Sequence, residues 1–177
     1  MIIRQCIFRQ ILWMITEGMK MNRVRRMIGC DHSEAAPYTG RGVCVAVLDS
    51  GVAAHPDLRG RIAVFRDFVL DKRQYYDDNG HGTHVSGILG GNGSMSRGQY
   101  RGIAPECTFI CGKVLDRNGG GSLKNLTRGL MWIAELLGRY PVRILNISIE
   151  MESEDGIDPG DWEEFRRYIR HLWDRNV

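Results

Sequence analysis

The stretch from Val43 to Gly51, Val-Cys-Val-Ala-Val-Leu-Asp-Ser-Gly, decides the fold class of this chain. Residues 43–48 form an uninterrupted apolar run rich in β-branched side chains, which is typical of a strand buried on both faces of a sheet. Asp49 follows directly, so a carboxylate is expected at the carboxyl end of this strand, where open α/β sheets place their ligands. An aspartate in this position is also common as a helix cap or turn residue, and the stretch alone leaves both interpretations open.

Other apolar runs, bounded by Gly, Pro or Asp, predict further strands at residues 62–69, 108–115 and 142–149. The acidic segment that follows, residues 150–156, is expected to be a loop. No internal repeat or low-complexity tract interrupts the pattern.

Two helical patterns lie between and after these strands. The first follows Ser122, a candidate N-cap, and places apolar residues three or four positions apart on one face: Leu123, Leu126, Leu130, Ile133 and Leu137. The second is predicted from Asp161 to about Asp174, where Asp161 and Glu164 fit the spacing of a capping box. Strands that alternate with helices predict an α/β fold built on a mainly parallel sheet.

Composition limits the classes of partner. The chain has 177 residues, 43% of them hydrophobic, which suits one globular domain or part of one. A net charge of +3 without dense basic runs does not favour a nucleic-acid partner. No apolar run reaches membrane-spanning length, and Arg4, Arg9 and Gln10 interrupt the apolar N-terminus, so neither a membrane span nor a signal peptide is expected.

The cysteines also bear on the compartment. The chain has five of them without paired spacing, Cys6, Cys30, Cys44, Cys107 and Cys111. We interpret them as reduced, largely buried thiols, which together with the missing signal peptide predicts a cytoplasmic protein. Cys107 and Cys111 would point to the same face of a strand, but a zinc site would need two more ligands that the sequence does not supply.

A second stretch, Asn-Gly-His-Gly-Thr-His-Val-Ser-Gly at residues 79–87, puts an ionisable ring between two glycines at the start of a predicted helix. Taken alone, His81 can equally be an ordinary histidine in a turn, without a functional role. His84 follows three residues later and raises a metal-site interpretation. That interpretation is weak, because neither an HExxH pattern nor a nearby third ligand is present.

Several segments, taken together, favour a functional interpretation of Asp49 and His81. Residues 46–52, 55–58 and 79–87 resemble the Asp and His motifs of the subtilisin-like serine proteases in their order and in the 32-residue gap from Asp49 to His81. Residues 102–105, 113–115 and 146–149 resemble the segments that lead to and flank the substrate cleft of that family. The resemblance covers residues 38–177. It implies a subtilisin-like, doubly wound, mainly parallel sheet with helices on both faces.

The resemblance implies roles for the paired residues. Asp49 would be the buried carboxylate that orients the ring, and His81 would be the general base of a Ser-His-Asp triad that hydrolyses peptide bonds. Gly80 and Gly82 would let the backbone turn tightly and leave one edge of the ring open to a nucleophile. The implied partner is a peptide or protein substrate.

The same resemblance implies two walls for that substrate. One is the backbone edge of Gly119, Gly120 and Gly121, suited to pairing with an extended peptide, although a flexible loop is the alternative. The other wall is Ile147, Ser148 and Ile149. Glu150 then stands where the family usually has glycine, and a side chain at that point is expected to narrow the pocket for the residue before the scissile bond.

No cofactor is expected. Asp57 matches a position that ligates calcium in some relatives, but the partner loop at residues 92–98 departs from their pattern. Calcium therefore stays a minor alternative.

Two segments that the family uses for catalysis are missing from this sequence. Family members continue into a strand that carries the oxyanion-hole Asn and a Gly-Thr-Ser segment that carries the nucleophile, and neither occurs here. Ser50 and Ser86 lie too close to Asp49 and His81 in sequence to replace the nucleophile, and Gly-x-Ser-x-Gly is absent. We therefore expect a sheet truncated on its C-terminal side.

The domain expectations follow from this pattern. Residues 38–177 would be a partial peptidase domain, residues 21–37 a lead-in with a short basic helix, and residues 1–20 an extension that is not native. Two hypotheses for function remain. The chain is an enzyme component whose serine is supplied by a separate or omitted C-terminal segment, or it is an inactive truncated product that retains a peptide-binding edge.

Overall fold

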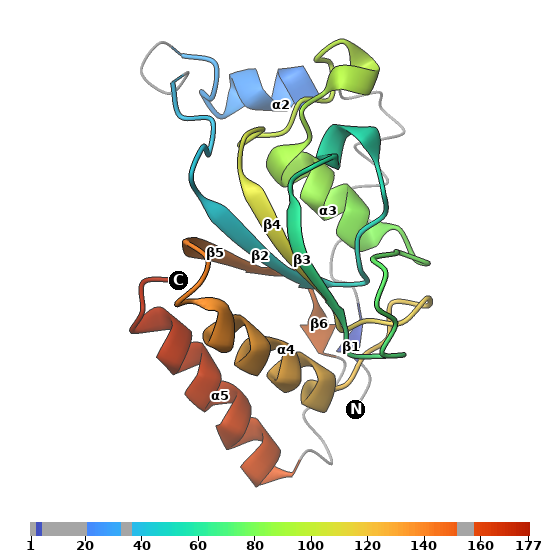
Figure 1. Cartoon of the computed structure of the whole chain (residues 1–177), viewed down its shortest axis with the longest axis vertical. Coiled ribbons are helices and arrows are strands. Elements are labelled where there is room, and N and C mark those ends of the chain that lie inside the picture. Colours follow the sequence, from blue (N-terminus) through green and yellow to red (C-terminus); the bar gives the residue numbers. More distant parts are fainter. Residues whose placement is uncertain (1–2, 5–20, 33–36, 152–157) are drawn as a thin grey trace.

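A single parallel sheet forms the centre of the molecule (Figure 1). The computed structural model describes residues 3–4, 21–32, 37–151 and 158–177. The sheet has the order β3-β4-β2-β5, and its strands are β2 (Cys44–Asp49), β3 (Ile62–Asp67), β4 (Thr108–Lys113) and β5 (Val142–Ile147). Every neighbouring pair is parallel. The predicted strands are confirmed, although the last three each end two residues earlier than expected.

The apolar run of β2 is buried on both faces, as its composition predicts. Cys44, Ala46 and Leu48 pack into one cluster with α4 (Leu123–Leu136) and α5 (Pro159–Trp173). Val45 and Val47 pack into a second cluster with α3 (His81–Gly90). Because alternate residues of a strand point to opposite faces, this one strand serves both cores. Helices on both faces of a parallel sheet confirm the expected doubly wound α/β fold (Figure 1).

Local sequence patterns predict the start of one helix correctly and the start of another wrongly. Ser122 caps α4 as expected, because its Oγ accepts a hydrogen bond from the backbone N–H of Asn125 at 3.1 Å. The predicted capping box at the start of the last helix is wrong. Asp158 is the N-cap of α5, its carboxylate accepts from the N–H of Gly160, and Pro159 opens the helix. Proline suits that position because it has no N–H to leave unpaired.

A short antiparallel pair lies at the end of the sheet away from α2 (Met21–Met27) (Figure 1). It joins β1 (Ile3–Arg4) to β6 (Glu150–Met151). The predicted loop at residues 150–156 is therefore wrong for its first two residues, and residues 152–157 lie outside the described ranges. The predicted extension at residues 1–20 falls mostly outside them as well.

The predicted basic lead-in helix is confirmed as α2, and one arginine anchors it. Buried Arg25 donates to the carbonyl of Gly102 at 2.5 Å and forms an ion pair with Asp31 at 2.8 Å. The helix is thereby tied to a loop 77 residues away.

Arg25→Ala is expected to lower the free energy of unfolding by about 2 kcal/mol, because it leaves a buried carbonyl without its donor. Urea unfolding at neutral pH measures this. Arg26→Ala, on the exposed face of the same helix, is the matched control and should change stability by less than about 0.5 kcal/mol. Equal effects of the two substitutions would contradict the anchoring role.

Candidate active site

Asp49 and His81 meet at the carboxyl end of β2. Asp49 is 0% exposed and ends the strand, and His81 is the first residue of α3. The ring Nδ1 lies 2.8 Å from Oδ1 and 2.9 Å from Oδ2 of the carboxylate. The other ring nitrogen, Nε2, is buried and has no hydrogen-bond partner among the described residues. A carboxylate at Nδ1 favours the tautomer with its proton there, which leaves the Nε2 lone pair free to accept one.

Two glycines allow this contact. Gly80 precedes the helix with φ of 98°, a left-handed conformation that side chains rarely adopt. Gly82 lies so close to the Asp49 strand that a Cβ would sit 2.1 Å from the carbonyl oxygen of Gly51. The expected tight turn is therefore present, and its cause is the close approach of two backbones.

A hydrogen-bond network at the start of α3 is not predicted from the sequence pattern. Ser50 Oγ donates to Asp77 Oδ1 at 2.9 Å and accepts from the N–H of Gly82 at 2.9 Å. The other oxygen of Asp77 accepts from both the N–H and the hydroxyl of Thr83. The run Asp-Asp-Asn-Gly at residues 77–80 signals a turn, but only the fold brings Ser50 to it.

Asp77 makes the start of α3 sensitive to acid. Burial by itself raises the pKa of this carboxyl, but hydrogen bonds from Thr83, Gly80 and Ser50 outweigh it and hold the pKa below its ordinary value. A depressed pKa means that the ionised group stabilises the fold above the unfolded pKa near 4, and that this stability is lost as pH falls through the folded pKa.

Asp77→Asn is therefore expected to lower the free energy of unfolding by about 1 kcal/mol at pH 7, after allowance for solvent screening. The difference from wild type should shrink as pH falls from about 5 to about 2. Urea unfolding as a function of pH measures both. A difference that stays constant over this range would contradict the role of the ionised carboxylate.

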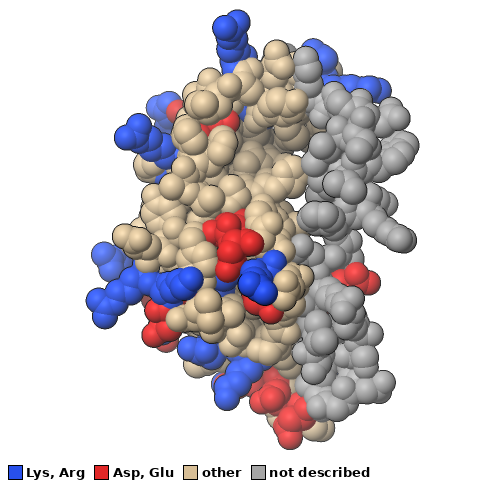
Figure 2. Space-filling view, turned by 90° about the vertical axis from the view of Figure 1, so that its right-hand side faces the viewer, with Lys and Arg blue, Asp and Glu red and all other residues tan. Residues whose placement is uncertain are grey.

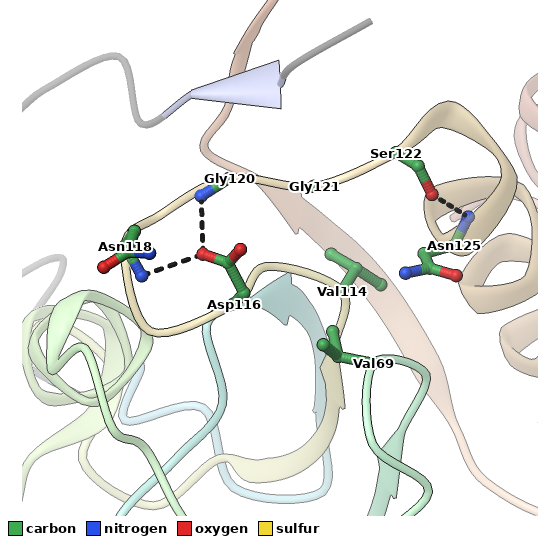
Figure 3. Close-up of a pocket in the computed structure, with 8 residues that line it drawn as sticks. All are labelled: Val69, Val114, Asp116, Asn118, Gly120, Gly121, Ser122 and Asn125. Carbon is green, nitrogen blue, oxygen red and sulfur yellow. Dashed lines mark hydrogen bonds between the residues drawn. The ribbon is translucent and has the colours of Figure 1, made fainter.

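The glycine loop beside the pair is held by an aspartate (Figure 3). Asp116 donates its backbone N–H to the carbonyl of Gly120, and its carboxylate accepts the N–H of Gly120 at 3.0 Å. The backbone groups of Gly120 are thus bonded within the loop and do not form the bare edge expected of all three glycines. Gly121 forms an antiparallel bridge with Leu115. Because the hydrogen bond of this bridge joins the flanking residues Asp116 and Gly120, Gly121 directs its own N–H and C=O away from Leu115.

A pocket of about 530 Å³ opens behind this loop (Figure 3). Its lining is polar along the loop and apolar at its base: Val69, Val114, Asp116, Asn118, Gly120, Gly121, Ser122 and Asn125. Of the three predicted glycines, Gly120 and Gly121 line it and Gly119 does not.

Comparison with known proteins decides the family. The model of the subtilase family, peptidase S8, matches residues 40–174. The chain belongs to the subtilase family. Serine protease AprX of Bacillus subtilis (strain 168) is 52% identical over 94 residues, 53% of this chain and 21% of that protein.

Two further subtilases match over longer stretches. Minor extracellular protease Epr of Bacillus subtilis (strain 168) is 41% identical over 122 residues, 69% of this chain and 18% of that protein. A crystal structure of a cold adapted subtilisin-like serine proteinase matches with a TM-score of 0.57 and 29% identity, over 75% of this chain and 44% of that one. This subtilase chain therefore spans less than half the length of each of these three relatives.

The second predicted substrate wall of the subtilase lies at the end of β5. Ile147 is the last residue of the strand, and Ser148 and Ile149 follow it half-buried. Asn146 donates its side-chain amide to Ser148 Oγ at 2.9 Å. Glu150 then begins β6 with an exposed side chain. The three residues therefore lead directly into a strand that already accepts an antiparallel partner.

The side chains considered for a metal site have the following surroundings. Asp57 Oδ1 accepts hydrogen bonds from Ser94 Oγ at 2.8 Å and from the N–H of Met95 at 3.0 Å. His84 is exposed, and Asp49 occupies Nδ1 of His81. No group of three potential metal-binding side chains occurs within the part of the chain that the structure describes.

The surface of the subtilase carries charges of both signs. Figure 2 shows one face, on which Lys and Arg are interspersed with Asp and Glu among the described residues. Mixed charge of this kind creates no large field of one sign on that face. Across the described ranges, no helix combines the length and the apolar character needed to cross a bilayer.

Proposed function

We propose that this chain supplies the general base and its orienting carboxylate to a serine endopeptidase site, as part of a peptidase domain over residues 38–177. The observation that carries the proposal is the bidentate contact of His81 Nδ1 with Asp49, made while the buried Nε2 has no partner among the described residues. This is the arrangement in which a histidine can take a proton from a nucleophile.

The chemistry then follows the triad mechanism. A serine hydroxyl attacks the carbonyl carbon of a peptide bond, and Nε2 of His81 takes the hydroxyl proton. The same nitrogen returns the proton to the leaving amine. Asp49 stabilises the imidazolium between these two steps. Hydrolysis of the acyl-enzyme repeats the sequence with water in place of the serine.

The serine would come from a separate or omitted C-terminal segment of the peptidase domain. The 177-residue sequence contains neither a Gly-Thr-Ser segment nor Gly-x-Ser-x-Gly. The site for that segment would be β5, which among the described strands has a sheet neighbour on one side only. Ile144 on this strand is 49% exposed, and Trp173 at the end of α5 is 77% exposed. An unpaired edge with apolar neighbours favours addition of another strand.

A reconstitution experiment tests this proposal. The purified chain alone is expected to hydrolyse a chromogenic peptide at no measurable rate, since it has no nucleophile and lacks an oxyanion-hole side chain worth about 100- to 1000-fold. Addition of a subtilase C-terminal segment that begins with the strand after α5 should produce hydrolysis sensitive to serine-protease inhibitors. Inhibitor-sensitive proteolysis by the chain alone would contradict the proposal.

The second candidate function is an inactive, peptide-binding module. It is favoured by the antiparallel pairing of β1 with β6, because the strand that follows Ile149 already accepts an added segment. A soluble, cooperatively folding monomer that binds extended peptides and ignores the C-terminal segment would support this alternative over the first.

Substrate preference and compartment stay predictions. An exposed Glu150 at the end of the predicted substrate wall would favour basic side chains near it, which a panel of peptide substrates would reveal. The cytoplasmic location rests on thiols, and Cys30, Cys44, Cys107 and Cys111 are free. One relative is named an extracellular protease, so localisation by cell fractionation decides this point.

A further inference from the structure

A buried lysine lies at the centre of the site without a role in the proposed chemistry. Lys113 ends β4, next to Asp49 in the register of the sheet, and its side chain is 0% exposed. An ammonium group removed from water costs several kcal/mol unless it is paired and hydrogen-bonded. An apolar residue is therefore the default at such a position, and the lysine needs an explanation.

The ammonium group donates hydrogen bonds to acceptors in three different loops. Its Nζ donates to the carbonyl of Ser50 at 2.6 Å, to Asp78 Oδ1 at 2.7 Å and to the carbonyl of Leu115 at 2.8 Å. Since an ammonium has three N–H groups, its capacity is fully used. The ring of Tyr76 lies 5.2 Å from Nζ and closes the site around it.

Each of these loops carries one part of the proposed site. Ser50 directly follows Asp49. Asp78 lies three residues before His81, in the turn that starts α3. Leu115 is the bridge partner of Gly121 at the base of the glycine loop. One point charge thus joins the carboxylate, the base and the peptide-binding edge.

We propose that Lys113 is a positioning residue, which sets the Asp49 loop, the His81 turn and the glycine loop relative to one another. It does not touch the reacting atoms. The inference rests on the proposed function for its purpose, but its geometry is testable without hydrolysis. A purely structural role is the alternative, and buried ion pairs of this kind often add little net stability compared with apolar residues.

The test compares two lysines that share one neighbour. Lys72 also packs over the ring of Tyr76, with Nζ 4.4 Å from its centre, but Lys72 is exposed and bonds none of the three loops through its side chain. Lys113→Met is therefore matched with Lys72→Met in the full 177-residue chain. The first readout is the proton NMR signal of His81 Nδ1, which a hydrogen bond to a carboxylate protects from exchange with water. The second is hydrogen exchange of residues 50–53, 77–82 and 115–121.

We expect Lys113→Met to abolish the His81 Nδ1 signal and to speed exchange in all three segments by about tenfold or more, while Lys72→Met changes neither. Retention of the signal and of exchange protection in a folded Lys113→Met chain would overturn the proposal. Exchange that rises equally across the whole molecule would also overturn it, since that is the result of general destabilisation.

If Lys113→Met does not fold, the same two readouts are measured on Asp78→Asn. This substitution weakens only one of the three bonds, at a side chain that is partly exposed. It should speed exchange at residues 77–82 and weaken the His81 signal, and an unchanged signal would count against the proposal.

The outcomes also separate this inference from the proposed function. Reconstituted proteolysis with an unchanged His81 signal in both variants would reject the lysine inference alone. Loss of the signal without reconstituted proteolysis would reject the proposed function alone.

Discussion

His81→Ala is expected to lower the kcat of the reconstituted protease by about a million-fold. Without the imidazole no group accepts the serine proton, and removal of the base from a triad costs about as much as removal of the whole triad. Peptide binding should be largely unaffected, so KM should change little. Chromogenic peptide hydrolysis by the chain mixed with a subtilase C-terminal segment provides the measurement.

His84→Ala is the matched control for this substitution. His84 lies one turn further along α3 with an exposed side chain, so its removal should leave kcat within about twofold. The melting temperature of both variants must stay close to that of the wild type. Substantial activity of His81→Ala would show that the base lies elsewhere, and equal losses in the two variants would point to a damaged helix.

Asp49→Asn is expected to lower kcat of the same mixture by about 10⁴-fold while the fold persists. An amide that replaces this carboxylate can hold the ring in the wrong tautomer, with the proton on Nε2, and it cannot stabilise the imidazolium. His81 Nδ1 lies within 2.9 Å of both carboxylate oxygens, and an asparagine amide replaces one of these two acceptors with an N–H donor.

Asp57→Asn is the control for the loss of a buried carboxylate. Asp57 is also buried and accepts hydrogen bonds, but from the loop at Ser94 and Met95 and not from His81. Its substitution should lower stability and leave kcat of the surviving enzyme unchanged. If Asp49→Asn retained nearly full kcat, the carboxylate would serve the fold and not the ring.

The architecture follows from short-range pattern. The apolar run of β2 is buried on both faces because every second side chain points the same way, so burial of six successive residues requires cover on two sides. The buried face of α4 and its Ser122 cap are likewise set by residues three or four positions apart. The last helix shows the limit of such patterns, because Asp158 and Asp161 offer competing starts and Pro159 decides between them.

The pairing of Asp49 with His81 could be predicted only because the motifs resemble those of a known family. Nothing in the residues alone brings together two side chains that are 32 positions apart. The resemblance did not extend to the residues that support them, or to the way in which Asp116 closes the glycine loop on Gly120.

The sequence by itself determined the alternation of strands and helices, the strand that is buried on both faces, and the residue types that a triad requires. Only the tertiary structure decided which polar groups surround that pair. Ser50 reaches Asp77 across 27 residues, and Lys113 reaches Ser50 across 63. Local patterns carry no record of such partners, because a buried donor needs only some acceptor within about 3 Å, and the packing of the parallel sheet decides which acceptor is there.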